Sequence, residues 1–286
     1  MRLHRDDLIL EYQKLAEMIH GYDGIVMPQL AMGINLKKNN RGQWAQVAPD
    51  QMTSEDIQDM IQKFVSAAIR AKKAGFDGVQ LHGAHGFVLS TFLSPAYNHR
   101  KDAYGGSTEN KSRIITDIIH SIKENCGDFH VSIKINSSDF MRGGLEPEES
   151  PDICQLLEKE GSDSIEVSGM GPCVDGIRPG SNEGFFAPYS KVLKQLVSIP
   201  VILTGGHRSV EHMEKLLNEN ATDYFSISRP LIREPGMISR WQNGDAKPSD
   251  CISCNQCFST HGHACIRGTI HADGTITKNK FERNER

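Results

Sequence analysis

The sequence contains no apolar run that approaches the ~18 residues of a membrane-spanning helix. Its N-terminus, MRLHRDDLILEYQ, lacks the apolar core of a secretory signal peptide. It also has no excess of basic residues, because 32 Lys and Arg stand against 36 Asp and Glu, for a formal net charge of −4. These absences argue against a membrane protein and against a basic nucleic-acid-binding surface, so we expect neither partner.

The chain also lacks the even cysteine count of a disulfide framework. Seven cysteines are present in 286 residues, and four of them fall within residues 251–265. Internal repeats and low-complexity segments are absent, and apolar residues make up 38% of the chain, which excludes a disordered protein. We therefore expect a globular, cytoplasmic protein in a reducing environment, in which the clustered cysteines serve as metal ligands rather than disulfide partners.

Short apolar runs alternate with longer segments of helical periodicity. The runs look continuous, which is typical of parallel strands buried on both faces. They are Gly24–Met27, Gly78–Leu81, His130–Ile135, Ser164–Val167, Pro200–Thr204 and Tyr224–Ile227. Among the helices between them, Thr53 and Asp56 form a capping-box pattern at one start, and Ser209 is a candidate N-cap at another. This alternation predicts an α/β protein with a parallel sheet and right-handed crossovers.

Two details favour a (β/α)8 barrel over a doubly wound sheet. Residues 30–52 and 82–109, which follow the first two strands, are long and rich in Gly, Asn and His, as active-site loops of barrels are. A Gly-Gly turn after the fifth strand and an Arg after the sixth match the position at which barrels bind phosphate. The sequence supplies six such strands, however, and not eight.

The segment VILTGGHRS, residues 201–209, has the pattern of a strand, a glycine pair and a helix start. Gly205 and Gly206 would let the backbone approach an anion, and the helix start would offer it free N–H groups. Arg229 ends the next strand, and its guanidinium can donate two hydrogen bonds to a phosphate. A tight turn and a surface ion pair are the ordinary alternatives, but together the two features predict a cofactor that ends in a phosphate.

Polar side chains also mark the ends of other strands. His82 and His85 would hold a substrate oxygen with their N–H groups, or they are loop histidines bonded to nearby backbone. Lys134 ends an apolar strand and needs an anionic partner, which is either a cofactor edge or a structural salt bridge. Gln29 could donate and accept at the imide edge of a heterocycle, or it is an ordinary polar strand end.

One long stretch, QLHGAHGFVLSTFLSPAYNHRKDAYGGSTENKSR, resembles the signature region of the old yellow enzyme family, the FMN-dependent ene-reductases. The resemblance continues through VSIKINSSDF, EGFFAPYSKVLKQLVSIPVILTGGHR and YFSISRPLIREP, over about residues 22–260. Within the family, the chain is most similar to the branch of the 2,4-dienoyl-CoA reductases and bacterial NADH:flavin oxidoreductases. The resemblance implies a TIM barrel and a ping-pong reaction, in which NAD(P)H reduces FMN and hydride then passes to an activated alkene.

The resemblance also implies a role for each candidate residue. Gln29 would contact the flavin pyrimidine ring, and Lys134 would lie near N1 and O2, where the family carries a basic residue. The carbonyl or nitro oxygen of the substrate would be bound by His82 and His85. The FMN phosphate would be held by Gly205, Gly206, Ser228 and Arg229.

The chain departs from the family pattern at three points. Phe87 stands where many members carry a Tyr proton donor, so the proton for the α-carbon must come from elsewhere. Ser228 replaces the Gly that is common before the phosphate-binding Arg. The chain starts in the helix before the family's third strand, Leu3 to Ile19. We therefore expect a barrel domain over residues 1–245 that lacks its first two strands, and a Cys-rich extension over residues 246–286.

The cysteine cluster has the spacing C-x2-C-x2-C-x7-C, at Cys251, Cys254, Cys257 and Cys265. Four thiolates at short spacing are typical of a zinc site or an iron–sulfur cluster. The dienoyl-CoA reductase branch has a longer second gap and a longer last gap. A remnant cluster with unligated thiols therefore remains the alternative.

Together these features predict an FMN-dependent oxidoreductase that uses NAD(P)H to reduce the activated C=C bonds of enones, enoates or dienoyl thioesters. FAD is not expected, because no G-x-G-x-x-G follows a first strand. Unpaired edges at Gly24–Met27 and Tyr224–Ile227 would favour a homo-oligomer. Two alternatives remain: a non-catalytic truncated barrel without flavin, and a barrel lyase or isomerase that uses the phosphate site for its substrate.

Overall fold

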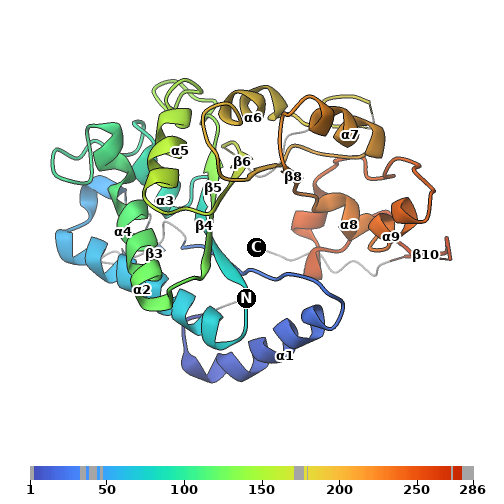
Figure 1. Ribbon diagram of the computed structural model, residues 1–286, viewed down its shortest axis with the longest axis horizontal. Coiled ribbons are helices and arrows are strands. Elements are labelled where there is room, and N and C mark those ends of the chain that lie inside the picture. Colours follow the sequence, from blue (N-terminus) through green and yellow to red (C-terminus); the bar gives the residue numbers. More distant parts are fainter. Residues whose placement is uncertain are drawn as a thin grey trace. The chain divides into compact units, whose positions relative to one another are not determined.

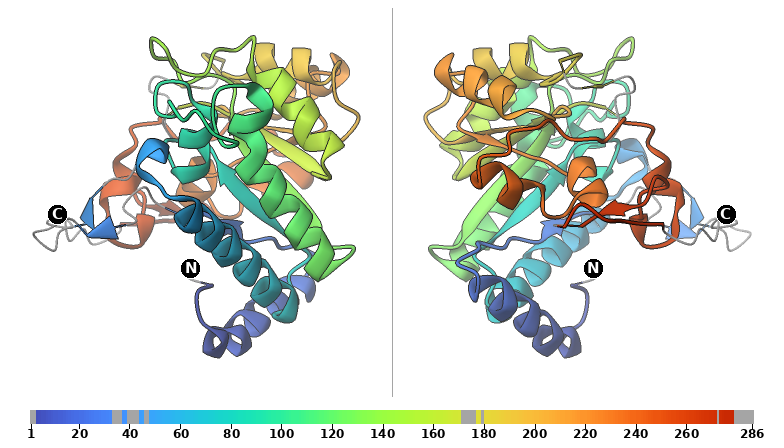
Figure 2. Two further views of the ribbon diagram at one scale, coloured as in Figure 1. Left: turned by 90° about the vertical axis from the view of Figure 1, so that its left-hand side faces the viewer. Right: turned by 90° about the vertical axis from the view of Figure 1, so that its right-hand side faces the viewer.

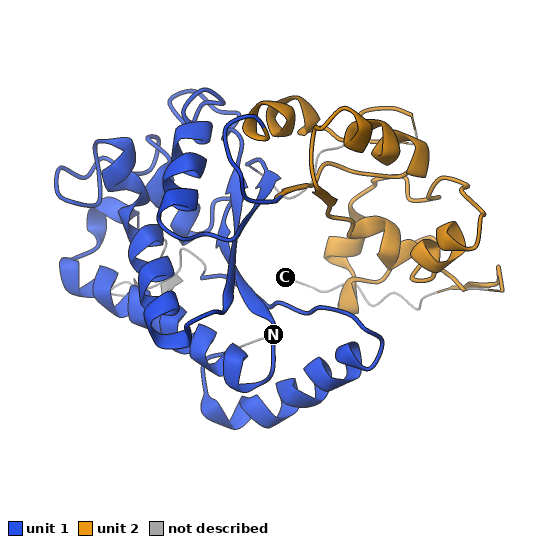
Figure 3. Cartoon of the chain, viewed as in Figure 1, with its two compact units in different colours: residues 1–170, 195–200 blue, residues 171–194, 201–286 orange. Residues whose placement is uncertain are grey.

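The computed structural model describes residues 3–32, 37–38, 44–45, 48–170, 177–178, 180–271 and 273–278. Much of the first predicted loop, residues 30–52, lies outside these ranges. Helices and parallel strands alternate along the chain (Figures 1 and 2). The chain divides into two compact units, unit 1 with residues 1–170 and 195–200, and unit 2 with residues 171–194 and 201–286 (Figure 3). The domain boundary that the sequence places at residue 245 stays a prediction.

Unit 1 is built on a parallel sheet in the order β1-β4-β5-β6. Its strands are β1 (Gln29–Leu30), β4 (Gly78–Gly83), β5 (His130–Asn136) and β6 (Ser164–Ser168). Its α-helices are α1 (Ile9–His20), α2 (Ser54–Lys73), α3 (Val88–Leu93), α4 (Thr108–Cys126) and α5 (Ser150–Lys159). It also contains the short helices η1 (Asp6–Leu8) and η2 (Pro49–Gln51) and the antiparallel pair β2 (Lys37–Lys38) and β3 (Trp44–Ala45).

The core of unit 1 lies between the sheet and three helices. Helices α2, α4 and α5 lie side by side along one face of β4 and β5 (Figures 1 and 2). Helix α4 contributes five isoleucines without exposed surface, Ile114, Ile115, Ile118, Ile119 and Ile122. Burial of a side chain of this size stabilises a fold by roughly 1.5–3 kcal/mol, so this helical stripe alone is a large part of the core. Helix α2 begins where the sequence predicts, directly after a capping box between Thr53 and Asp56.

The two faces of the unit 1 sheet differ in chemistry. In β5, the alternate residues Val131, Ile133 and Ile135 are fully buried in the core, whereas Ser132, Lys134 and Asn136 share the opposite face. The expectation of continuous apolar strands is therefore wrong for this unit. The strands are largely buried, as predicted, but they alternate apolar and polar side chains. The second face is consequently a buried polar surface, which a fold built for packing alone would not need.

Unit 2 contains the parallel pair β7 (Val201–Leu203) and β8 (Tyr224–Phe225). Its α-helices are α6 (Ala187–Leu193), α7 (Val210–Asn218), α8 (Arg229–Arg233) and α9 (Met237–Gln242). The C-terminal part has the short helices η3 (Gln256–Ser259) and η4 (His261–His263) and the antiparallel pair β9 (Thr269–Ile270) and β10 (Ile276–Thr277). Ser209 stands at the N-cap position of α7, as predicted, but its side chain makes no capping hydrogen bond.

Each of the six predicted strands has a counterpart in the sheets, which confirms the α/β class. The first is displaced, because β1 pairs with β4 at Gln29 and Leu30 and not over Gly24–Met27. The earlier residues still run beside β4, since the Pro28 carbonyl accepts a hydrogen bond from the Gln80 N–H at 3.0 Å. Gln29 is therefore the first residue of the two-residue strand β1 and does not follow a strand over Gly24–Met27.

Candidate functional site

The polar face of the unit 1 sheet brings together residues from all four strands. Gln29 of β1 lies in register with Gln80 of β4. His82 lies in register with Lys134 of β5, which is in register with Glu166 of β6. Because residues two apart on a strand point to the same face, Gln80 and His82 share one surface. The register thus places three of the four unit 1 residues predicted from the sequence, Gln29, His82 and Lys134, on this polar face.

The fourth residue, His85, lies in the loop that follows β4. It adopts a left-handed backbone conformation, with φ at 61°. Its backbone N–H donates to Asn136 Oδ1 at 3.1 Å, and its ring Nε2 lies 2.7 Å from Ser168 Oγ. These two contacts, to the last residues of β5 and β6, fold the loop back over the sheet. The rings of His82 and His85 meet edge to face, with 5.0 Å between their centroids.

The two histidines are neutral at physiological pH. Burial, followed by the positive charge of Lys134, lowers the pKa of His82 to about 4. The same two causes, together with His82 itself, lower the pKa of His85 to about 3. Among the described residues, Nδ1 of His82 has no hydrogen-bond partner although it is buried. A neutral imidazole with an unbonded nitrogen can donate a hydrogen bond to a ligand oxygen. A buried polar group without a hydrogen-bond partner is unfavourable, and a bound ligand could supply that partner.

The depressed pKa of His82 predicts a pH dependence of stability. The unfolded chain takes up this proton near pH 6.5 and the folded chain only near pH 4, so acid favours unfolding within that window. We expect His82 to contribute about 3 kcal/mol to the fall in unfolding free energy between pH 7 and 4. The variant His82→Asn should show a shallower fall in urea titrations over this range. An identical slope in both proteins would contradict the burial of a neutral His82.

Lys134 makes an ion pair on the same face, which is the structural alternative that the sequence left open. Its Nζ lies 2.8 Å from Glu166 Oε1, and the two side chains are 15% and 8% exposed. The amide of Gln80 donates to Glu166 Oε2 at 2.7 Å, and the amide of Gln29 donates to Gln80 Oε1 at 2.7 Å. A chain of polar contacts therefore crosses the sheet from β1 to β6. It fixes the positions of Gln29 and Lys134 before any ligand binds.

Sequence reasoning missed Glu166, Gln80, Asn136 and Ser168, which complete this polar face. Their signal is present in the alternation of GVQLHG, HVSIKIN and SIEVS. Each strand has polar residues at every second position, which is typical of a sheet with one polar face. Treating these strands as continuous apolar runs concealed the signal.

Phe87 also belongs to this cluster. Its ring lies 4.4 Å from the ring of His82, centroid to centroid, and it precedes the first turn of α3 as the N-cap residue. The position that the family resemblance assigns to a proton donor therefore faces the histidines. A phenyl ring there cannot donate a proton.

Unit 2 contains the glycine pair. Gly205 and Gly206 follow β7 with φ of 121° and 84°, a region that residues with a Cβ rarely adopt. The Gly205 carbonyl accepts from the Phe185 N–H at 3.0 Å. Among the described residues, neither the Gly205 nor the Gly206 N–H donates a backbone hydrogen bond. The turn is therefore a tight one with two N–H groups left for an anion.

The backbone N–H groups at the start of α7 are less available to an anion than the sequence suggests. Glu183 accepts hydrogen bonds from the backbone N–H groups of Arg208 and Ser209 at 2.9 and 3.0 Å. The carboxylate of Glu183 thus occupies the N-terminus of α7, where it is favoured by the helix dipole. An anion at this turn would rely on the N–H groups of Gly205 and Gly206 and not on those of the helix.

Substitution at Gly205 should be strongly destabilising. A Cβ there would lie 2.7 Å from the backbone nitrogen of Phe185, which cannot move without distorting the turn. We expect Gly205→Ala to lower the unfolding free energy by about 2–3 kcal/mol. The matched control is Gly244→Ala, which has φ of 92° but no atom within 4 Å of the added carbon. It should lose only about 1 kcal/mol in the same denaturant titration. Equal losses for the two variants would contradict the close packing at residue 205.

Arg229 is the first residue of α8, and Ser228 is its N-cap residue. The Ser228 side chain makes no capping hydrogen bond. Nη1 of Arg229 donates to Asn255 Oδ1. Among the described residues, no carboxylate forms an ion pair with Arg229. Its charge is therefore left for an anionic ligand.

The four clustered cysteines line one small cavity of unit 2, together with Arg229 and Arg233. All four carry free thiols. Within the described residues, however, no group of three or more His, Cys, Asp or Glu side chains is arranged to hold a metal ion. The thiols are gathered but do not fit a preformed metal site, so the metal site stays a prediction and unligated thiols stay the alternative.

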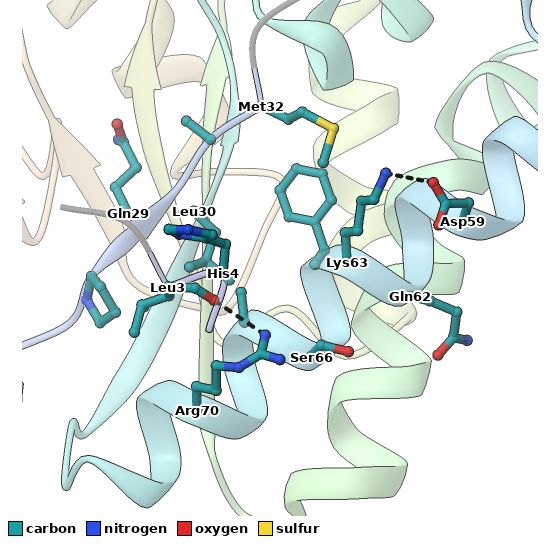
Figure 4. A pocket seen from close by; sticks show the side chains of 14 residues that line it. Leu3, His4, Gln29, Leu30, Met32, Asp59, Gln62, Lys63, Ser66 and Arg70 are labelled. Carbon is teal, nitrogen blue, oxygen red and sulfur yellow. Dashed lines mark hydrogen bonds and ion pairs between the residues drawn. The ribbon is translucent and has the colours of Figure 1, made fainter. Parts of the chain in front are cut away.

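A larger cavity of about 680 Å³ lies in unit 1 between the N-terminal residues, β1 and α2 (Figure 4). Gln29 is the one predicted site residue in its lining. Its cations are already paired, because Lys63 contacts Asp59 at 2.5 Å and Arg70 contacts Asp6 at 2.5 Å. Arg70 also donates to the Leu3 carbonyl at 3.2 Å (Figure 4). Its chemistry is therefore distinct from that of the polar face.

Comparisons with known proteins show the family to which the chain belongs. A model of the NADH:flavin oxidoreductase / NADH oxidase family matches residues 1–247. The NADH oxidase of Thermoanaerobacter brockii is 34% identical over 273 residues, which cover 89% of this chain and 42% of that protein. The NADPH dehydrogenase of Clostridium acetobutylicum is 33% identical over 194 residues, which cover 66% of this chain and 56% of that protein. The chain spans about half the length of these two curated relatives.

Solved structures show the fold. A complex of 2-naphthoyl-CoA reductase aligns with a TM-score of 0.80 at 23% identity, over 90% of this chain and 44% of that one. The old yellow enzyme homologue from Zymomonas mobilis aligns with a TM-score of 0.69 at 22% identity, over 85% of this chain and 74% of that one. These likenesses confirm the predicted α/β barrel fold class. In the described part of the chain, no helix has the length and apolar character needed to cross a bilayer.

Proposed function

Because the chain belongs to the NADH:flavin oxidoreductase / NADH oxidase family, we propose that it binds FMN, takes electrons from NAD(P)H and reduces activated C=C bonds. The observation that carries the proposal is the polar face of unit 1, with two neutral histidines above a paired lysine. A relative named NADPH dehydrogenase and a structural neighbour named 2-naphthoyl-CoA reductase support this reaction class. Enones, enoates and dienoyl thioesters are the substrate classes that the proposal includes.

Each unit, taken by itself, has donors that suit one part of FMN. In unit 1, Lys134 offers a cation to the anionic edge of the flavin ring, and Gln29 offers an amide to its pyrimidine part. In unit 2, the N–H groups of Gly205 and Gly206 and the guanidinium of Arg229 suit a phosphate, with Ser228 beside them. When bound, FMN supplies the hydride chemistry.

The chain's own residues bind and polarise the substrate. His82 and His85 would donate N–H hydrogen bonds to a carbonyl or nitro oxygen, which draws electron density away from the alkene β-carbon. Because both imidazoles are neutral, they stabilise developing charge on that oxygen without losing a proton themselves. Water is the proton source for the α-carbon, since Phe87 cannot serve.

Four further predictions accompany this function. Small molecules are the expected partners, and the chain is expected to be a homo-oligomer, which light scattering of the purified protein would test. The cytoplasmic location stays a prediction. Metal analysis of anaerobically purified protein would test the predicted zinc or iron–sulfur site at Cys251, Cys254, Cys257 and Cys265.

The experiment that tests the function is the absorbance spectrum of the protein mixed with FMN, followed by anaerobic addition of NAD(P)H and then of an enone. We expect flavin bands that shift on binding, bleach with NAD(P)H and return with the enone. A protein that leaves added FMN unbound would contradict the proposal and favour a barrel without flavin. Bleached flavin that the enone does not reoxidise would refute only the alkene reduction.

A further inference from the structure

The guanidinium of Arg229 is held by a residue of the Cys-rich segment. Arg229 starts α8, and its Nη1 donates to the Oδ1 of Asn255, which lies between Cys254 and Cys257. An arginine side chain has several rotatable bonds, and a phosphate needs its planar fork in one orientation. Because Asn255 holds one guanidinium nitrogen of Arg229, the orientation of the other guanidinium N–H donors is fixed as well. The contact with Asn255 therefore affects the orientation in which Arg229 can bind an anion.

Asn255 is itself placed in an unusual way. Its backbone is left-handed, with φ of 59° and ψ of 3°, and it is the N-cap residue of η3. An asparagine at an N-cap normally uses its side chain to accept from the helix N–H groups, but Asn255 makes no such bond. Its side-chain oxygen accepts from Arg229 instead. The backbone still closes the turn, because the Asn255 carbonyl accepts from the Phe258 N–H at 3.1 Å.

The same segment also holds the loop of the glycine pair. Arg208 is buried and donates to the Cys251 carbonyl at 3.2 Å and to Ser253 Oγ at 2.6 Å. In return, the Ser249 N–H donates to the Arg208 carbonyl at 2.8 Å. Residues 249–255 thus contact Arg229 and also Arg208, which comes two residues after the glycine pair. Among the described residues, Arg229 has no carboxylate partner. The guanidinium of Arg208 is buried and its nitrogens already donate to protein groups, which leaves Arg229 as the cation for an anion.

We propose that Asn255 is a positioning residue that orients Arg229 toward the phosphate, so that it sets the preference of the site for FMN over riboflavin. This inference rests on the proposed FMN site. It assigns a role in flavin recognition to the Cys-rich segment that does not depend on metal binding by its thiols. Asn255 acts through Arg229 and does not itself contact the flavin.

The test compares the dissociation constants of FMN and riboflavin for flavin-free protein, by quenching of flavin fluorescence. The variant Asn255→Gly removes the acceptor but tolerates the left-handed backbone. It should weaken FMN binding about 10-fold and leave riboflavin binding unchanged, since a hydrogen bond to a charged group is lost. Asn255→Asp should also weaken FMN selectively, because a carboxylate neutralises Arg229. The control Asn243→Gly, at the exposed end of α9, should change neither constant.

A double-mutant cycle separates positioning from a general effect on the fold. If Asn255 acts through Arg229, Asn255→Gly should have no further effect on FMN in the Arg229→Ala background. Additive losses, or a parallel loss of riboflavin binding, would overturn the inference. If the wild-type protein prefers FMN and the Asn255→Gly variant keeps the full preference, the inference is overturned and the proposed function is left intact. A wild-type protein that binds FMN and riboflavin equally would overturn the inference together with the phosphate site, whereas a protein that binds neither flavin would overturn the proposed function.

Discussion

Replacing Arg229 by Ala should weaken FMN binding about 100-fold while the protein stays folded. The guanidinium is the one cation that the candidate phosphate site presents at the start of α8, and it has no carboxylate partner among the described residues. Two charged hydrogen bonds to a phosphate would be lost, each worth about 1.5 kcal/mol or more. Fluorescence titration with FMN measures the loss, and far-UV circular dichroism checks the fold.

Lys215→Ala is the matched control for this prediction. It removes an exposed cation from α7 in the same unit without touching the glycine turn. It should retain wild-type affinity, which separates the local contact from a change in net charge. Stoichiometric FMN in the purified Arg229→Ala protein would show that the phosphate is held elsewhere.

Replacing Phe87 by Tyr should accelerate alkene reduction, with an expected gain within the ~10²–10⁴-fold range of a placed general acid. The ring of residue 87 lies 4.4 Å from the ring of His82, so a hydroxyl added to it lies near the proposed substrate oxygen and α-carbon. The reduction of the flavin by NAD(P)H should change little, because no proton donor is needed in that half-reaction. Single-turnover kinetics with a small enone measure the two steps separately.

Phe258→Tyr adds the same hydroxyl at a half-exposed position of unit 2 and should alter neither half-reaction. If Phe87→Tyr also altered neither, position 87 would not face the substrate. The transfer of the family's active-site arrangement to the loop after β4 would then be wrong.

The sequence predicted the architecture well because strand and helix signals are local. Apolar periodicity and the Thr53 capping box each act within a few residues. The displaced first strand shows the limit of this reasoning. Gly24–Met27 has the apolar character of a strand, but the register with β4 is set by pairing across the sheet, which places β1 at Gln29 and Leu30. Strand propensity is a local property and does not specify that long-range pairing.

The site was predicted in part for the same reason. His82 and Lys134 lie in the carboxyl-terminal halves of β4 and β5, and Gly205 and Arg229 follow β7 and β8. Their positions relative to the strand ends can be read from the sequence alone. Their partners come from distant segments: Glu166 pairs with Lys134, and Asn255 with Arg229, 32 and 26 residues away along the chain. Such contacts depend on the folded register and on loop conformation. The alternation of SIEVS could have indicated a polar face, whereas no local signal indicates Asn255 as a partner of Arg229.

The proposed function requires that the chain hold a flavin and that His82 and His85 bind the substrate which the flavin reduces. Anaerobic stopped-flow measurement of both half-reactions, in the wild-type protein and in the His82→Ala/His85→Ala variant loaded with FMN, tests it most directly. We expect NAD(P)H to reduce the flavin at similar rates in both proteins, and the enone to reoxidise it at least 100-fold more slowly in the variant. Equal reoxidation rates in the two proteins would contradict the account.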